Sequence, residues 1–130
     1  MHGYIERSIS SEVEEYLHLF PAVALLGPRQ CGKSRLAARL LEKQPASVMI
    51  DLESPRDRSK LSDPLLFLEA NANKLVCIDE VQLLPDLFPI LRAEIDRDRR
   101  PGRFLLLGSA SRELVNRSSE SLAGRIGIKD

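Results

Sequence analysis

The feature that most constrains the fold of this chain is an eight-residue segment, residues 27–34, which matches the pattern Gly, any four residues, Gly-Lys-Ser/Thr. Its members are Gly27, Pro28, Arg29, Gln30, Cys31, Gly32, Lys33 and Ser34. The apolar run before it, residues 22–26, is long enough for a buried strand and too short for a helix, and leucines recur at helical spacing after it. A strand, a glycine loop and a helix therefore follow one another here, which is the context that a phosphate-binding loop requires.

The residue types in this segment suit a polyphosphate. Glycines allow backbone N–H groups to face the anion, and the helix that follows adds its unpaired N–H groups and the positive end of its dipole. Lys33 would then reach the β- and γ-phosphates, and the hydroxyl of Ser34 would be a ligand of Mg²⁺. The alternative is a chance match in a surface loop, because short motifs carry false positives.

Composition and charge exclude several other classes of protein. With 130 residues, 43% of them hydrophobic, the chain is expected to form one small globular domain. Its 19 basic residues are balanced by 19 acidic ones, so nothing supports binding to nucleic acid or to a membrane surface. The most basic stretch, residues 97–103, contains Asp98 and is interpreted as a solvated helix end.

Cysteine usage and the absence of targeting signals indicate the cytoplasm. Cys31 lies in the phosphate-loop motif and Cys77 in an apolar run, a distribution that favours reduced thiols. Cys31 is either a redox-sensitive thiol near a helix N-terminus or merely a tolerated small residue. No apolar run reaches membrane-spanning length, and the N-terminus resembles neither a signal peptide nor a transit peptide.

Helices and strands are predicted to alternate along the chain. The predicted helices are a leader at residues 4–20, one from the phosphate loop to about residue 43, a short one from residue 63, one at 86–97 and a partly helical stretch at 111–125. The predicted strands are residues 22–26, 46–52, 75–78 and 104–107, with a fifth beginning at 126–128, and residues 53–60 are predicted to be a polar loop. Unbroken apolar strands of this kind indicate a parallel sheet covered on both faces. The predicted fold class is an α/β three-layer sandwich of the P-loop type.

Two further positions fit chemistry at a bound phosphate. The third predicted strand runs directly into Asp79-Glu80, where the aspartate would hold Mg²⁺ and the glutamate would polarise the water that attacks the γ-phosphate. The fourth strand ends in Gly108-Ser109, and Ser109 would lie between that water and the γ-phosphate. The alternatives are a charged strand end for the acidic pair and an ordinary turn for Ser109. Strand carboxyl ends are where α/β sheets bind their ligands, which favours the functional interpretation.

These segments together resemble a known family. Residues 27–34, 78–82, 108–111 and 120–125 are similar to the prokaryotic AAA+-type ATPases that carry a C-terminal domain of unknown function. The resemblance covers nearly the whole chain and implies a sheet in the order 5-1-4-3-2, ATP with Mg²⁺, and hydrolysis between subunits of a homo-oligomer. It also implies that Arg125 is an arginine finger acting in trans, a surface arginine being the alternative. Arg29 is a weaker candidate for contact with phosphate or with a neighbouring subunit.

The chain also departs from that family. It stops at Asp130, where the fifth strand would still be incomplete, so residues 1–130 are expected to be a truncated ATP-binding core without the lid or the C-terminal domain. Guanine specificity is not expected, because Val76 stands where an Asn-Lys-x-Asp motif needs aspartate. Three functions stay open: a Mg²⁺-dependent ATPase, a nucleotide-binding switch or interaction module that hydrolyses ATP inefficiently, and a small-molecule phosphotransferase. What work the ATP would drive, and for which partner, stays undecided at this point.

Overall fold

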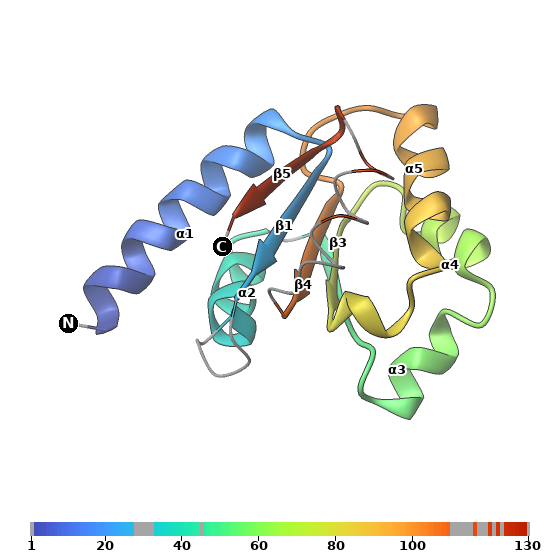
Figure 1. Cartoon of the computed structure of the whole chain (residues 1–130), viewed down its shortest axis with the longest axis horizontal. Coiled ribbons are helices and arrows are strands. Elements are labelled where there is room, and N and C mark those ends of the chain that lie inside the picture. The colour runs from blue at the N-terminus through green and yellow to red at the C-terminus, as the bar shows by residue number, and fades with distance from the viewer. Residues whose placement is uncertain are drawn as a thin grey trace.

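A five-stranded parallel sheet forms the centre of the protein (Figure 1). The computed structural model describes residues 2–27, 33–44, 46–109, 116, 120, 122 and 124–129. The strands are β1 (Ala22–Leu26), β2 (Ser47–Asp51), β3 (Leu75–Asp79), β4 (Phe104–Gly108) and β5 (Ile126–Lys129). They lie in the order β2-β3-β4-β1-β5, which is the predicted order 5-1-4-3-2 counted from the other edge. The predicted fold class is therefore confirmed.

The fifth strand is short but paired. Its four residues run parallel to β1, with Ile126 opposite Ala22 and Lys129 opposite Leu25. Pairing thus extends along four of the five residues of β1. A fifth strand that only begins to form was expected, and β5 is a short strand whose four residues all pair with β1.

Helices cover both faces of the sheet (Figure 1). Helices α1 (His2–Leu19) and α2 (Lys33–Glu42) pack on one face. Helices α4 (Pro64–Ala70) and α5 (Leu87–Arg97), together with the 3-10 helix η1 (Val81–Leu83), pack on the other. Helix α3 (Pro55–Lys60) follows β2 and contributes no buried residue. The leader helix is confirmed, and within the described part of the chain no helix is long and apolar enough to cross a membrane.

The core consists of two layers that the strands separate. In β4, Phe104 and Leu106 face the layer beneath α5, whereas Leu105 and Leu107 face the layer beneath α1 and α2. Because successive side chains of a strand point to opposite faces, a strand buried on both sides must be apolar at every position. This requirement explains the unbroken apolar runs in β1, β3 and β4, all of whose residues except the last one of β3 are apolar.

One predicted loop is a helix. Residues 53–60 contain α3, whose N-cap Ser54 accepts a hydrogen bond from the backbone N–H of Asp57 at 3.4 Å and whose first helical residue is Pro55. A cap followed by proline is a helix-start signal, and the same signal was used correctly for Asp63 and α4. The loop prediction was wrong because polarity was given more weight than capping: α3 contains no buried residue and so shows no apolar periodicity.

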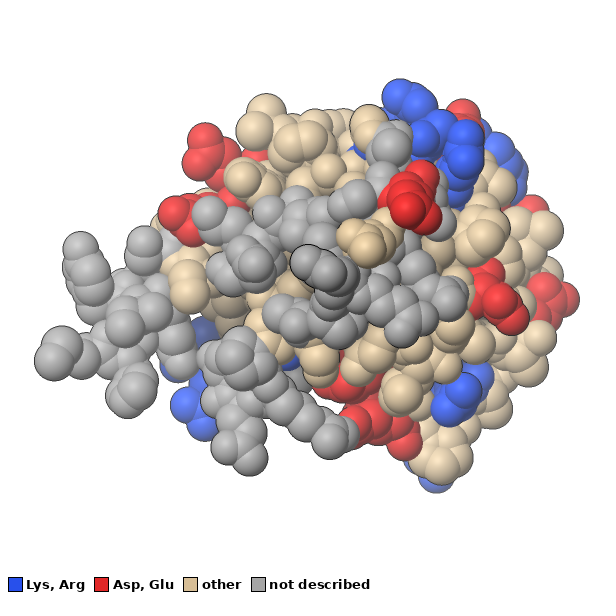
Figure 2. All heavy atoms as spheres, in the orientation of Figure 1, with Lys and Arg blue, Asp and Glu red and all other residues tan. Residues whose placement is uncertain are grey.

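The basic stretch at residues 97–103 was only partly predicted. Basic side chains gather over the end of α5 in Figure 2, and the side chains of Arg97, Arg99 and Arg100 are exposed there. Arg103 is different: it is 3% exposed, stacks on the ring of Phe104 at 5.2 Å, and pairs with Glu94 at 3.5 Å. This arginine joins the end of α5 to the start of β4, so the interpretation as a wholly solvated helix end was wrong for it.

Candidate functional site

The candidate site lies where the strands β1, β3 and β4 end. The register places Leu26 opposite Gly108, and the backbone N–H of Gly27 donates to the carbonyl of Gly108 at 3.2 Å. β4 lies between β1 and β3, so Gly27, Asp79 and Ser109 follow three neighbouring strand ends. The topology therefore brings together three of the segments that the sequence singled out, at the edge where α/β sheets bind ligands.

Lys33 is the best-defined element of the phosphate-loop motif. It is the first residue of α2, is 6% exposed, and donates from Nζ to the carbonyl oxygen of Gly27 at 2.6 Å. This hydrogen bond joins the end of β1 to the start of α2 and holds a buried ammonium at the N-terminus of a ten-residue helix. A buried cation beside helix N–H groups fits a phosphate group well.

Other parts of this motif are not described. Pro28, Arg29, Gln30, Cys31 and Gly32 lie outside the described residues, and so does the side chain of Ser34. Ser34 itself is the second residue of α2. The roles predicted for these residues stay predictions.

Asp79 ends β3 and is 8% exposed. Its register partner is Asp51, the last residue of β2, which was not singled out as a site residue. Asp51 also ends a strand, and that position is the signal that would have found it. Its carboxylate accepts from the backbone N–H of Glu53 at 3.0 Å and its own N–H donates to Asp57 at 3.0 Å, so it shapes the turn into α3.

Cys77 lies two residues before Asp79 in β3 and has a raised pKa. Burial, and secondly the nearby carboxylate of Asp79, raise the pKa of the Cys77 thiol above its ordinary range. Cys77 is a free cysteine with no exposed surface. It is therefore held as a neutral thiol in the core, which is consistent with the expectation of a reduced thiol.

Glu80 has an unusual backbone. It adopts the left-handed conformation with φ 58° and ψ 47°, and it is the only described residue other than glycine with positive φ. Its side chain is 9% exposed and accepts a hydrogen bond from Nε2 of Gln82 at 2.5 Å. The involvement of Gln82 was not predicted from the sequence, since residues two apart face each other in neither a helix nor a typical turn.

Ser109 directly follows β4 and is half-buried. Its position next to Gly108, between the strand that carries Asp79 and the strand that leads into the phosphate loop, agrees with the topology assumed for it. Its contact with a bound phosphate or water stays a prediction.

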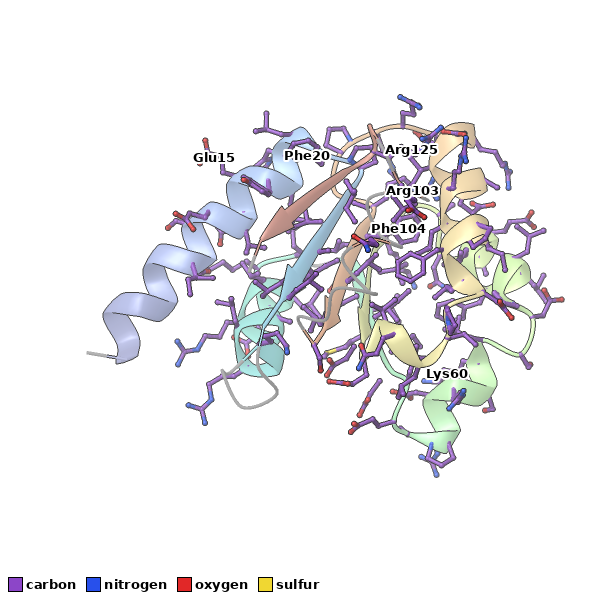
Figure 3. All side chains as sticks on the ribbon, viewed as in Figure 1. Glu15, Phe20, Lys60, Arg103, Phe104 and Arg125 are labelled. Carbon is purple, nitrogen blue, oxygen red and sulfur yellow. The ribbon has the colours of Figure 1, made fainter. Side chains whose placement is uncertain are left out.

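Arg125 lies where the parallel strands begin, at the end of the sheet opposite to the candidate site. It directly precedes β5, and its carbonyl accepts from the N–H of Ala22 at the start of β1. Figure 3 shows it at the same end of the molecule as Phe20 and Arg103. The whole length of β1, five residues or about 16 Å at ~3.3 Å per residue, separates it from Gly27.

The guanidinium of Arg125 is held within its own chain. Nε and Nη2 donate to the two carboxylate oxygens of Asp96 on α5, at 2.7 and 3.1 Å. This two-pronged pair lowers the pKa of Asp96 and raises that of Arg125, in each case chiefly through the hydrogen bonds. Arg125 is thus not among the residues that the fold gathers at its own candidate site.

A divalent cation would have to rely on oxygens from several sources. Among the residues that the structure describes, no group of three His, Cys, Asp or Glu side chains has the arrangement of a metal site. Asp79 is the described residue best placed to take part, and Mg²⁺ characteristically binds through one or two protein ligands, waters and substrate phosphates.

Comparison with known proteins gives three results. The family model described as "AAA domain" matches residues 19–130. Two curated relatives, uncharacterized proteins of Mycobacterium bovis and Mycobacterium tuberculosis, are each 48% identical over 122 residues, which are 94% of this chain and 27% of theirs. The solved structure of PCH-2 from C. elegans covers 95% of this chain, with 41% of that protein matched, 21% sequence identity and a TM-score of 0.49.

The chain thus spans about a quarter of the length of those curated relatives, and the family match extends over most of it. We conclude that this chain belongs to the AAA domain family, with the core of an AAA-type P-loop ATPase.

Proposed function

We propose that this chain binds ATP with Mg²⁺ and hydrolyses the terminal phosphate. The observation that carries the proposal is the buried ammonium of Lys33, bonded to the carbonyl of Gly27 at 2.6 Å and lying at the first turn of α2. Its support comes from the acidic pair at the end of β3, two strands away at the same edge. Adenine is favoured over guanine by the valine at position 76 and by the family.

Each residue has a defined task in this proposal. Lys33 neutralises the β- and γ-phosphate oxygens. Hydrogen bonds to these oxygens replace its hydrogen bond to the carbonyl oxygen of Gly27. Ser34 and Asp79 hold Mg²⁺, which when bound supplies charge neutralisation of the phosphates. Glu80 accepts the proton of the attacking water, and Ser109 orients that water against the γ-phosphate.

Arg125 belongs to the same proposal but acts on a neighbouring copy. Its position at the far edge of the sheet favours contact with the site of a second subunit, for which it must leave Asp96. An arginine supplied in trans contributes about 10³–10⁵ in turnover. In a mixture of inactive Arg125→Ala and inactive Lys33→Ala chains, the intact site of the first can receive the intact arginine of the second, so ATPase activity should be restored. A mixture that stays inactive would contradict the trans role.

The ATP-binding step is tested by calorimetry on Lys33→Ala. Loss of a charge-assisted contact to phosphate weakens ATP binding by about 10- to 100-fold. Lys43→Ala is the matched control, because Lys43 is exposed at the other end of α2 and pairs with Glu14 at 3.1 Å. Equal ATP affinity in Lys33→Ala and the wild type would contradict the proposal.

Hydrolysis is tested separately with Glu80→Gln. This variant should bind ATP normally and lose multiple-turnover phosphate release, because an amide cannot accept the proton of the water. A wild-type chain that binds ATP but releases no phosphate would instead support the nucleotide-binding switch that the sequence left open.

A further inference from the structure

The contact between Gln82 and Glu80 has a geometry that an ordinary turn would not produce. In a regular helix, side chains two residues apart point away from each other. Here Glu80, in the left-handed conformation between β3 and η1, accepts a hydrogen bond from Nε2 of Gln82 at 2.5 Å. The contact therefore depends on a backbone conformation that is costly for a residue with a Cβ atom.

The fold holds this conformation from both sides. Asp79 precedes Glu80 and is paired within the sheet, while Val81 follows it and is 1% exposed in the core. The carbonyl of Glu80 accepts from the N–H of Leu83 at 3.0 Å, which closes the 3-10 turn. The backbone that presents the Glu80 carboxylate is thus fixed by the sheet, the core and a hydrogen bond.

The hydrogen bond also fixes the orientation of the Gln82 amide. The amide nitrogen of Gln82 faces Glu80 and donates to a carboxylate oxygen, which is an acceptor. The other end of the amide, Oε1 of Gln82, is buried and has no hydrogen-bond partner in the described part of the structure. A buried acceptor without a donor is unfavourable. The hydrogen bond from Nε2 to Glu80 is therefore made although it leaves Oε1 of the same amide without a partner in the described part of the structure.

We propose that Gln82 is a positioning residue for hydrolysis, which holds the carboxylate of Glu80 in the orientation that accepts the proton of the attacking water. This inference rests on the proposed function, because it assigns Gln82 a task only if Glu80 is the base. In that step the water oxygen forms a bond to the γ-phosphorus and the bond from phosphorus to the leaving ADP oxygen breaks. The proton of the water passes to Glu80, whose second oxygen stays bonded to the Gln82 amide.

Positioning affects the chemical step rather than binding. A displacement of a catalytic group by about 1 Å costs on the order of 10²-fold in rate. Lys33, the residue proposed to bind the phosphates, lies at the start of α2 and bonds to Gly27 beyond the end of a different strand, β1. Replacing the amide by an apolar side chain should therefore lower kcat and leave KM unchanged. It should also leave stability nearly unchanged, because the unpartnered Oε1 is removed together with the hydrogen bond.

The experiment compares Gln82→Met and Gln82→Glu with the wild type. Met has a similar length and no donor, and we expect kcat to fall about 10- to 100-fold with KM constant within about twofold. Glu places a second carboxylate against Glu80 and should lower kcat further. Gln44→Met, at an exposed site beyond the end of α2, is the matched control and should behave as the wild type.

A second measurement does not depend on hydrolysis. In nucleotide-free protein, the side-chain amide resonances of Gln82 in a ¹H–¹⁵N spectrum should differ from those of the exposed Gln44. In Glu80→Ala they should move to the position typical of a solvated amide. Unchanged resonances would show that the contact is not made in solution, and this would overturn the proposal.

The outcomes are distinguishable. Unchanged or faster hydrolysis in Gln82→Met, in a protein whose Glu80→Gln variant is inactive, would refute positioning while leaving the proposed function intact. A rise in KM or a fall in melting temperature, with kcat unchanged, would assign Gln82 a structural role, against the proposal. An inactive wild-type chain would refute the proposed ATPase function, and the positioning role with it, whatever the amide resonances show.

Discussion

Replacing Glu80 by glycine and, in a second variant, by alanine tests whether the fold imposes a left-handed backbone on this residue. Both replacements remove the carboxylate and its hydrogen bond to Gln82, so the two variants differ only by a Cβ atom. At most positions alanine is the more stabilising of the two, because glycine has more conformational freedom to lose on folding. At φ 58° the order should be reversed.

The size of the difference follows from two opposing terms. A left-handed backbone costs an L-residue about 1–2 kcal/mol, which glycine avoids. Against this, the greater freedom of glycine in the unfolded chain costs about 0.5–1 kcal/mol. We therefore expect Glu80→Gly to be more stable than Glu80→Ala by about 0.5–1 kcal/mol, or about 2–4 °C in melting temperature for a chain of this size.

The assay is equilibrium urea denaturation, with calorimetric melting as a second probe. Ala93→Gly is the matched control, because Ala93 is exposed within the right-handed helix α5 and should lose about 1 kcal/mol when replaced by glycine. The signs at positions 80 and 93 should thus be opposite. If glycine destabilises both positions to a similar extent, the backbone at position 80 is not left-handed in solution, and the geometric argument for Gln82 fails with it.

Three further predictions concern stability. Gly127→Ala should destabilise the fold by about 1–3 kcal/mol in urea denaturation, because a Cβ atom there would approach ring carbons of Phe20 to 2.7 Å and of Tyr16 to 2.8 Å. An unchanged midpoint would mean that the end of α1 and Phe20 do not pack tightly on β5. Arg103→Met should cost about 3 kcal/mol, since it leaves the 2%-exposed Glu94 with less compensation, and adding Glu94→Leu should recover much of the loss; a double variant no more stable than the single one would contradict this. The pKa of Asp57 is lowered in the folded state, first by a hydrogen bond from a backbone N–H. Its contribution to folding stability is therefore present above the unfolded pKa of about 3.9 and is lost as the pH falls through the folded value. The difference in stability between wild type and Asp57→Asn should become smaller over that acid range, and a difference that grows there would contradict the prediction.

Much of the candidate site was predictable because its signals are local. The glycine motif and the apolar strand before it identified Gly27 and Lys33, and the structure joins these two residues by a hydrogen bond. The end of β3 pointed to Asp79 in the same way, since an apolar run followed by acidic residues is a local pattern. The helix α3 was missed, although its cap was equally local, because it has no buried face to produce a periodic pattern.

Other features depend on residues that are distant in the sequence. In the sequence, Arg103 cannot be distinguished from the other basic residues of its stretch. Only the packing of α5 against the start of β4 buries it beside Glu94. Arg125 could be proposed as an arginine finger, but the pairing of β5 with β1 places it at the edge opposite Gly27 and beside Asp96. Long-range contacts of this kind leave no mark in local composition.

By itself, the sequence determined the alternation of strands and helices, the burial of the sheet on both faces and the glycine loop that leads into α2. These properties follow from apolar periodicity and from a short motif, which act within a few residues along the chain. Only the tertiary structure decided that Glu80 has a left-handed backbone and meets Gln82. A backbone conformation that is unfavourable locally persists only where the surrounding sheet and core hold it in place, and those restraints come from contacts between distant parts of the chain.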